Sequence, residues 1–421
     1  MLTQTDPLLR ILAAASRSCP RSIVQQSCAP PARRQWHRSL QTGPVNRSQT
    51  PDFAFAFDID GVLLRSSNPL PHARQALTLL QRLRIPFILL TNGGGRHERD
   101  RVAELSRLLS IQISPSMFVQ SHTPFADLID QTDQHDKTKM PLKDKTVLVC
   151  GGDGDDCRQV AESYGFTSVV TPADIITSTP TLWPFTSPQS YTTHARPLPH
   201  PIYNPSSTSP THLTISSIFV FADPRDWALD TQLIIDILLS QRGVLGTTRS
   251  HSVPTQDHSA SNVPLYFSNP DLHWASQYHI PRLGQGGFKA AFMGVWKETH
   301  RGIPLEGKTI GKPSQETYAF AEKRLVKHRR ELLGTPKGET VGLRKVYMVG
   351  DNPLSDIQGG NTYLSPLGSV WNTILVRTGV YNDREIPPHK PTVTVDGVWD
   401  AVKWALEREG WPTDEIERQL A

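Results

Sequence analysis

The chain has 421 residues, of which 37% are hydrophobic and 20% are charged, and its formal net charge is +4. This length allows two or three domains with a large buried core. No stretch approaches the roughly 18 consecutive apolar residues that a transmembrane helix needs, so we expect a globular protein and not an integral membrane enzyme.

The positive charge is concentrated in the first 50 residues. This segment holds seven Arg, no Lys or Glu and a single acid, Asp6, which gives it a charge of +6 and leaves −2 for the rest of the chain. The nearly neutral body offers no basic face for nucleic acid. An Arg-rich, Ser-rich and acid-poor leader is typical of a mitochondrial transit peptide. A disordered tail without a targeting role is the alternative interpretation of residues 1–50.

Four cysteines are present, and two of them, Cys19 and Cys28, lie in this leader. Cys150 and Cys157 are separated by six residues in one local segment, which is not the framework of a disulfide-stabilised secreted protein. We therefore expect reduced thiols. No metal-type Cys/His spacing occurs.

The chain after residue 51 begins with alternating strands and helices. The aromatic-rich run 53–57 is expected to be a buried strand, followed by a helix over 71–83, a strand over 86–90, a helix over 96–109 and a strand over 117–119. This alternation favours a parallel α/β sheet.

A second α/β set begins after about residue 121. Its expected elements are strands over 146–150, 218–221 and 265–267, and helices over 157–164 and 230–240. Residues 177–214 are rich in Pro, Ser and Thr and have little apolar periodicity, so we expect a long insert loop there.

The final third of the chain returns to α/β alternation. Helices are expected over 287–300 and 314–327, and strands over 346–349 and 373–376. No internal repeat is present.

Two polar motifs follow strands in the first region. Asp58-Ile59-Asp60-Gly61 stands at the carboxyl end of the strand 53–57, the edge at which open α/β sheets bind ligands. Two carboxylates at this spacing can share a divalent cation while one attacks and the other moves a proton. Thr91 and Asn92, followed by Gly93, Gly94 and Gly95, supply a hydroxyl, an amide and unobstructed backbone N–H groups that suit an oxyanion. Taken alone, the first motif is more often only a solvated turn, and the second is as typical of a glycine-rich turn as of a site.

Two further motifs occur in the final third. Lys312 lies at the start of a predicted helix and can neutralise charge on a phosphoryl group and an attacking carboxylate. Asp351 and Asp356 follow the apolar strand 346–349 and add carboxylates suited to a hard cation. A surface lysine and an Asx-rich turn are the alternative interpretations.

The joint occurrence of these four motifs, in this order, resembles the haloacid dehalogenase (HAD) superfamily. The resemblance implies that Asp58 is the nucleophile, Asp60 the general acid/base, Thr91 a phosphate hydrogen-bonding residue and Lys312 a charge-stabilising residue. It also implies Mg²⁺ as the cofactor, held by Asp58, the backbone carbonyl of Asp60 and Asp351, with Asp356 in support. Hydrolysis would pass through a phospho-aspartyl intermediate on Asp58.

The spacing of the motifs resembles one subfamily in particular. Thr91 follows Asp58 by 33 residues, which leaves no room for a domain, whereas 220 residues separate Thr91 from Lys312. A cap inserted at the second place is similar to subfamily IIA, and closer to its cat-eye-syndrome-critical-region-like branch. The expected fold is thus α/β, with a Rossmann-like core over 51–120 and 285–421 and an α/β cap over 121–284. Members of this branch are generally mitochondrial, which agrees with the leader and predicts the matrix.

Several other residues are candidates for the site. Asn92, Gly93 and Gly94 are predicted to contact phosphate, and Asn269 and Asp271 are predicted to face substrate, with turn duty as the alternative for the last two. Arg282, Gln285 and the glycines 284, 286 and 287 are candidate hinge or phosphate-side residues. The run 151–154 lacks the spacing of a dinucleotide-binding loop.

The resulting prediction is a phosphatase for a small phosphorylated metabolite, with a homodimer through the cap as the expectation that subfamily caps suggest. One alternative is a non-catalytic or weakly active mitochondrial HAD-fold binding protein. The other is a phosphatase linked to glycerophospholipid metabolism. The substrate is not determined by the sequence.

Overall fold

A computed structural model describes most of the chain after the leader. The described residues are 51–132, 140–185, 193–248, 263–274, 276, 278–299, 305, 307–336 and 341–411. The predicted transit peptide and a short part of the predicted insert, residues 186–192, lie outside them. No helix in the described part of the chain is long and apolar enough to cross a membrane.

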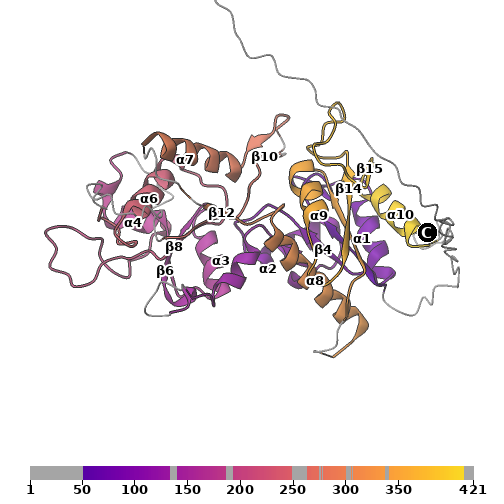
Figure 1. The fold of residues 1–421 in the computed structure, drawn as a ribbon, viewed down its shortest axis with the longest axis horizontal. Helices are drawn as coiled ribbons and strands as arrows, with labels where there is room; N and C mark the ends of the chain where they lie inside the picture. Colours follow the sequence, from indigo (N-terminus) through magenta and orange to yellow (C-terminus); the bar gives the residue numbers. More distant parts are fainter. Residues whose placement is uncertain are drawn as a thin grey trace, which may run out of the picture. The chain divides into compact units, whose positions relative to one another are not determined.

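The first sheet has six parallel strands in the order β15-β14-β13-β1-β4-β5. Three of them, β15, β14 and β4, are labelled in Figure 1. The strands are β1 (Phe53–Phe57), β4 (Phe87–Leu90), β5 (Phe118–Val119), β13 (Lys345–Gly350), β14 (Val370–Val376) and β15 (Val393–Val395). The order reverses at the central pair β1 and β13, so the loops after these two strands open a crevice for ligands.

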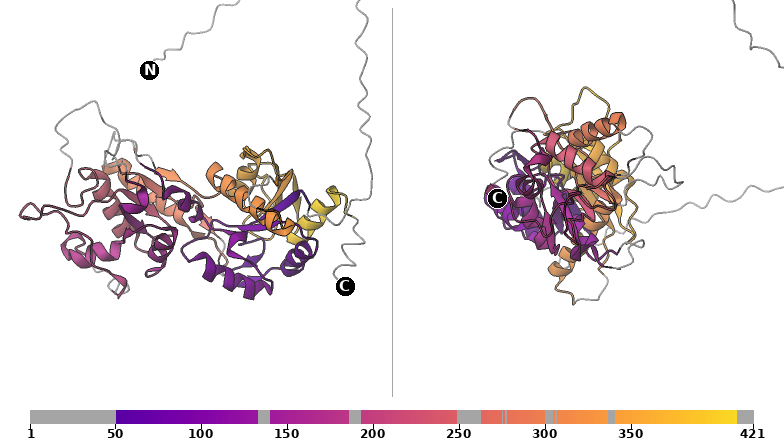
Figure 2. Two further views of the ribbon diagram at one scale, coloured as in Figure 1. Left: turned by 90° about the horizontal axis from the view of Figure 1, so that it is seen from below. Right: turned by 90° about the vertical axis from the view of Figure 1, so that its left-hand side faces the viewer.

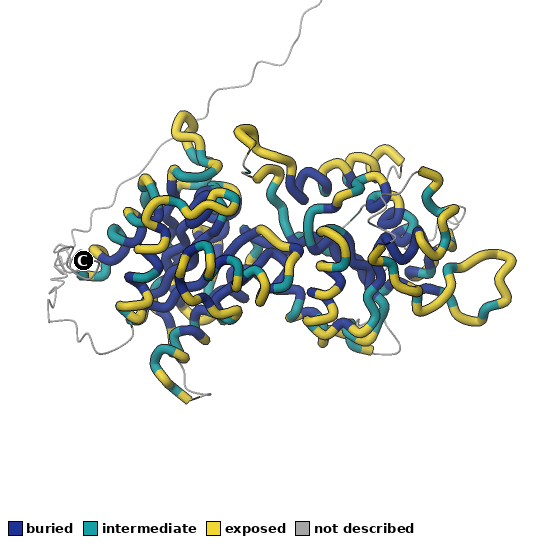
Figure 3. Tube along the Cα trace, turned by 180° about the vertical axis from the view of Figure 1, so that it is seen from behind, coloured by how far each residue is buried: buried dark blue, intermediate teal, exposed yellow. Residues whose placement is uncertain are grey.

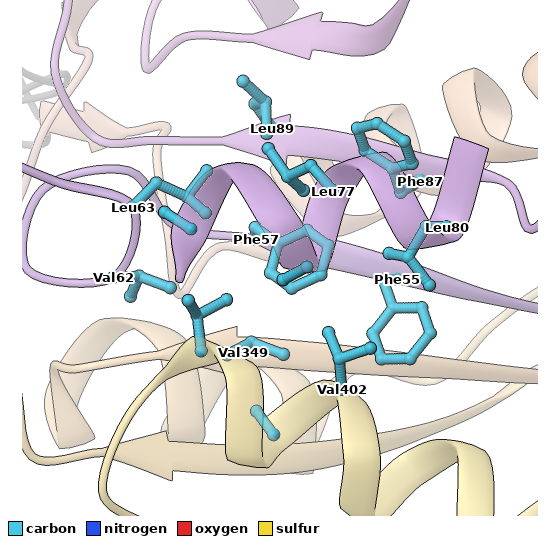
Figure 4. Packing of buried hydrophobic residues seen from close by; sticks show 14 of the residues in the cluster. Phe55, Phe57, Val62, Leu63, Leu77, Leu80, Phe87, Leu89, Val349 and Val402 are labelled. Atoms are coloured by element: carbon cyan, nitrogen blue, oxygen red, sulfur yellow. The ribbon is translucent and has the colours of Figure 1, made fainter. Parts of the chain in front are cut away.

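Helices cover both faces of this sheet. Alternate residues of β1 point to opposite faces, so Phe55 and Phe57 join one buried cluster while Ala54 and Ala56 join another. The first cluster includes α1 (Ala73–Arg82), α2 (Glu98–Leu109) and α10 (Val398–Arg408), and Figure 4 shows the β1 aromatics between α1 and α10. The second cluster includes α8 (Gln315–Leu333), and the short α9 (Gln358–Thr362) also contacts it. Figure 2 shows these helices from two further directions.

The second sheet has five parallel strands in the order β12-β9-β8-β6-β7. They are β6 (Thr146–Cys150), β7 (Ser168–Val170), β8 (Ser217–Val220), β9 (Leu265–Phe267) and β12 (Gly307–Thr309). One face packs on α4 (Pro172–Ser178), α6 (Trp227–Leu239) and α7 (Gln285–Thr299), and the other on α3 (Asp156–Tyr164). In Figure 3 the central strands of both sheets are in the buried class. This part of the chain forms a second α/β domain inserted between Thr91 and Lys312, as predicted.

The return to the first sheet comes later in the chain than the predicted boundary at residue 285. Phe288, Phe292 and Trp296 of α7 are buried against the second sheet, and β12 pairs with β9. Both α7 and β12 therefore belong to the inserted domain. Apolar periodicity indicates that a helix packs on something, but it does not indicate which sheet.

The predicted insert is anchored at its end. Leu213 and Ile215 are buried with the second sheet's helices, and Arg196 pairs with Glu162 of α3 (Nη1–Oε1 2.7 Å). Two antiparallel hairpins also escaped the sequence analysis: β2 (Leu64–Arg65) with β3 (Asn68–Pro69), and β10 (His273–Trp274) with β11 (Arg282–Leu283). Elements this short carry no detectable periodicity. Cys150 and Cys157 are buried free thiols.

A buried carboxyl in α6 makes stability depend on pH. Asp230 is 1% exposed, and its Oδ1 has no hydrogen-bond partner among the described residues. Burial, assisted by the charge of Asp226, raises the pKa of Asp230 to about 8. The native state therefore keeps a proton that the unfolded chain loses near pH 4, so stability is lost as pH rises from about 4 to about 8.

We predict that Asp230→Asn, which keeps the shape without the ionisation, increases the free energy of unfolding at pH 7.5 by roughly 2–4 kcal/mol. The gain should shrink towards zero near pH 4. Denaturant unfolding of both proteins at several pH values measures it, and the exposed Asp396→Asn is the control, with no comparable pH-dependent difference. An equal effect of Asp230→Asn at pH 4 and pH 7.5 would contradict the assignment.

Candidate active site

A buried lysine joins two of the predicted motifs. The Nζ of Lys312 donates to Oδ1 of Asp58 at 2.6 Å and to Oδ1 of Asp356 at 2.7 Å. Asp58 follows β1, Asp356 lies beyond the end of β13, and Lys312 precedes α8. Burial opposes the charge on Lys312, but the carboxylates of Asp356 and Asp58 outweigh it and raise the pKa of the ammonium. Lys312 is therefore cationic throughout the physiological range.

Asp351 completes a group of three carboxylates. One oxygen each from Asp58, Asp351 and Asp356 lies within 4.8 Å of the others, and all three residues are buried. The backbone N–H of Val380 donates to Oδ2 of Asp351 at 2.6 Å, and that of Asn352 donates to Oδ2 of Asp356 at 3.0 Å. These hydrogen bonds from the backbone hold the carboxylates of Asp351 and Asp356 in place.

Two glycines make room for Asp351. A Cβ on Gly379 would lie 1.7 Å from Oδ2 of Asp351, and a Cβ on Gly61 would lie 2.4 Å from the same atom. Gly61 also has a φ of +87°, which favours glycine. The backbone can approach the carboxylate this closely only where no side chain intervenes.

The charges of the group fit a divalent cation. Three buried carboxylates face one ammonium, so negative charge is left uncompensated in a poorly solvated place. Burial raises the pKa of Asp351 well above its ordinary value, and the charges of Asp58 and Asp356 add to this effect. Burial likewise raises the pKa of Asp58, against the opposing charge of Lys312. A set of carboxylate oxygens at this spacing suits Mg²⁺.

The loop after β4 lines the same place. Thr91 and Asn92 are buried, and Gly93 donates its N–H to Oγ1 of Thr91 at 3.0 Å. The side chain of Asn92 accepts from the N–H of Lys312 at 2.7 Å and donates to its carbonyl at 3.0 Å. Asn92 therefore holds the backbone of Lys312 in position, a role that the sequence prediction of phosphate contact did not include.

Asp60 lies apart from the carboxylate group. Its side chain does not belong to the cluster of Asp58, Asp351 and Asp356, so any metal contact would come from its backbone carbonyl, as the family resemblance implied. Burial raises the pKa of Asp60, partly opposed by the charge of Arg101 in α2. A carboxyl group whose pKa is raised by burial is better suited to donate a proton than an exposed one.

The inserted domain closes the other side of a cleft of about 610 Å³ that contains these residues. Asn269 and Asp271, the predicted substrate-facing residues, line it, and Oδ2 of Asp271 accepts from Asn92 at 3.0 Å. Burial raises the pKa of Asp271 to about 6 against the stabilising bond from Asn92. Gly284 also lines the cleft, whereas Arg282 is exposed and stacks on Tyr278.

Gln285 has a structural role. Its side-chain oxygen accepts from the N–H of Asn269 at 2.8 Å, and its amide donates to Oγ of Ser268 at 3.1 Å. It therefore positions the loop that carries Asn269 and Asp271. The run 151–154 lines a different cavity, in the second sheet, of about 180 Å³.

The sequence analysis missed several residues of the cleft, among them Arg101, Asp223, Arg225, Ser66 and Ser67. Arg101 occupies a helix face among other charged residues, and Arg225 follows β8 in the inserted domain. Position after a strand was a usable signal for Arg225. No local pattern separates Arg101 from the neighbouring arginines of α2.

Two family models match the chain at these motifs. A model described as haloacid dehalogenase-like hydrolase matches residues 55–167, which include Asp58, Asp60 and Thr91. A model described as HAD-hydrolase-like matches residues 309–401, which include Lys312, Asp351 and Asp356.

Curated relatives match over most of the chain. A mitochondrial hydrolase of Saccharomyces cerevisiae is 40% identical over 372 residues, which cover 84% of this chain and 96% of that protein. A cardiolipin synthase (CMP-forming)/mitochondrial hydrolase fusion protein of Schizosaccharomyces pombe is 38% identical over 388 residues. That match covers 89% of this chain and 58% of the fusion protein.

The fold also resembles a solved structure. A hypothetical protein from Pyrococcus horikoshii superposes with a TM-score of 0.50 at 18% identity, over 84% of this chain and 99% of that one. At this identity the likeness concerns the fold alone.

We predict that Gly379→Ala weakens binding of a divalent cation about 10–100-fold, because the new methyl group must displace the carboxylate of Asp351. Calorimetric titration with Mg²⁺ or Mn²⁺ measures the effect without any substrate. Gly294→Ala is the matched control, since a Cβ there meets nothing within 4 Å. Equal cation affinity of both variants, with both folded by circular dichroism, would refute this role of Gly379.

Proposed function

Because the chain belongs to the haloacid dehalogenase-like hydrolases, we propose that it is a Mg²⁺-dependent phosphohydrolase that forms a phospho-aspartyl intermediate on Asp58. The observation that carries this proposal is the position of Lys312, whose ammonium bridges Asp58 and Asp356 at the floor of the cleft. A carboxylate nucleophile needs such a partner, because it must approach a phosphoryl group of the same charge.

In the first step, a carboxylate oxygen of Asp58 attacks phosphorus and the bond from phosphorus to the ester oxygen breaks. Asp60 donates its proton to the departing alcohol oxygen, consistent with the raised pKa of its buried carboxyl. Lys312 and Thr91 face the phosphoryl oxygens. In the second step Asp60 takes a proton from water, the water oxygen attacks the phosphorus of phospho-Asp58, and phosphate leaves with the Asp58 carboxylate restored.

The carboxylates of Asp58, Asp351 and Asp356, with the carbonyl of Asp60, would hold Mg²⁺. The cation would supply charge neutralisation at the phosphoryl oxygens. Asp351 is positioned for this by the N–H of Val380 and by the close approach of Gly61 and Gly379.

The cleft supports a proposal for the substrate class. Its volume of about 610 Å³ suits a small phosphorylated metabolite, and Asn269, Asp271 and Arg225 on the inserted domain face the catalytic residues. These three residues are proposed to select the alcohol part of the substrate.

A second, narrower candidate is a phosphatase of glycerophospholipid metabolism. The fission yeast relative is joined in one polypeptide to a cardiolipin synthase, which places a similar domain beside phospholipid chemistry. We also propose a mitochondrial location, in the matrix, from the Arg-rich leader and the names of both relatives. Association of two chains through the inserted domain is proposed from the family resemblance alone, and analytical ultracentrifugation tests it.

We predict that the full chain hydrolyses at least one phosphomonoester in the presence of Mg²⁺, and that Asp58→Asn lowers kcat by at least about 1000-fold because no nucleophile remains. The panel comprises p-nitrophenyl phosphate, glycerol phosphates, phosphoglycolate, pyridoxal phosphate and nucleotides, with phosphate release as the measurement. Equal inactivity of the wild type and Asp58→Asn on every compound would favour the alternative of a HAD-fold binding protein.

The leaving group tests the role of Asp60. Asp60→Asn should lower kcat about 100–10,000-fold for glycerol 3-phosphate, whose alkoxide must be protonated, and far less for p-nitrophenyl phosphate, whose phenolate leaves unaided. Asp100→Asn, an exposed carboxylate of α2, is the matched control. An equal loss on both substrates would remove Asp60 from the role of general acid.

A further inference from the structure

An apolar groove opens from the catalytic cleft. It has a volume of about 770 Å³ and shares Asp271, His273, Asn352 and Val380 with the cleft. One wall comes from the β10–β11 hairpin region, and the other from the segments that follow β13 and β14. The groove therefore begins where the alcohol part of a substrate would leave the catalytic residues.

Large aliphatic side chains that are exposed to solvent line this groove. Leu272, Ile280 and Leu354 are 51%, 51% and 56% exposed, and Ile386 is 94% exposed. These residues come from both walls. A cluster of exposed apolar side chains beside a cleft is typical of a ligand-binding surface.

The charges around the groove restrict which kinds of ligand it can bind. Among its described lining residues the charged side chains are those of Asp271 and Glu385, and Lys and Arg are absent from this lining. A second phosphate or a carboxylate would be repelled there, whereas an uncharged hydrocarbon chain would not. The cationic side chains, Lys312, Arg101 and Arg225, line the cleft and suit the phosphoryl end of the same molecule.

We propose that the groove binds a hydrocarbon chain of the substrate, so that the protein acts on a phosphomonoester of an acylated alcohol, such as a monoacylglycerol phosphate. This inference rests on the proposed phosphatase function. The phosphoryl group lies at Asp58 and Lys312, and the chain passes Asp271 and Val380 to reach Ile280 and Ile386.

The length of the hydrocarbon chain gives a quantitative test. Full burial of one methylene changes binding about fourfold, and a groove open on one side covers about half of it, which gives roughly twofold per methylene. Six additional methylenes therefore predict a change of about 60-fold. Butanoyl and decanoyl esters of glycerol 3-phosphate differ by this number and share one head group.

The experiment compares kcat/KM of the full chain with Mg²⁺ for p-nitrophenyl phosphate, glycerol 3-phosphate and the two acyl esters, all below their micelle concentrations. We expect kcat/KM to rise about 60-fold from the butanoyl to the decanoyl ester, through a lower KM. Turnover that does not depend on chain length would overturn the proposed role of the groove, but it would still support the proposed phosphatase function. Calorimetric binding of the two esters to Asp58→Asn tests the groove without turnover, and equal affinities would overturn it even if no compound were hydrolysed.

Variants separate the groove from general hydrophobicity. Ile280→Glu combined with Ile386→Glu should reduce the decanoyl-to-butanoyl ratio to within about threefold of one. Leu364→Glu is the matched control, because Leu364 is 85% exposed and lies outside the groove lining. A ratio that persists in the double variant would overturn the proposal. A second outcome would also overturn it: the wild type self-associates, the double variant does not, and the decanoyl-to-butanoyl ratio is the same in both. The groove would then be a contact surface between two copies of the chain.

Discussion

The ammonium of Lys312, held between the carboxylates of Asp58 and Asp356, is the interaction on which the rest of the site depends. Without it, three buried carboxylates would repel one another, and their buried charges would be uncompensated. Lys312 comes from the start of α8, Asp58 from the end of β1 and Asp356 from beyond β13. Each packs in place only if the first sheet and its helices form correctly, so the electrostatics of the site and the fold of the core are coupled.

The inserted domain is connected to this site by its contact with Asn92, which lies in the loop after β4. The same side chain binds the backbone of Lys312 and the carboxylate of Asp271, so the loop after β4 connects Lys312 with the wall of the cleft that the inserted domain forms. Gln285 supports that wall by fixing the loop of Asn269. Hydrogen bonds therefore connect the inserted domain directly to the backbone of Lys312.

The cleft and the groove are suited to different parts of a substrate. Cationic side chains gather where a phosphoryl group would lie, and aliphatic side chains gather along the path that leads away from it. In the proposed function, the charged cleft would select the phosphoryl end of a substrate and the apolar groove would select the length of its hydrocarbon chain. A small-molecule phosphatase without the groove would need only the first, so chain-length dependence distinguishes a general phosphatase from one that acts on acylated alcohols.

The sequence by itself determined the α/β alternation of both halves, the strand ends that carry Asp58, Thr91 and Asp351, and the choice of Lys312 as the proposed catalytic lysine, because apolar runs and the polar residues that end them are local features. The tertiary structure alone decided that α7 packs on the second sheet, that Asn92 holds Lys312, and that a groove adjoins the cleft. Each of these depends on surfaces brought together from distant parts of the chain. Local periodicity specifies that a face is apolar, and the fold specifies what that face meets.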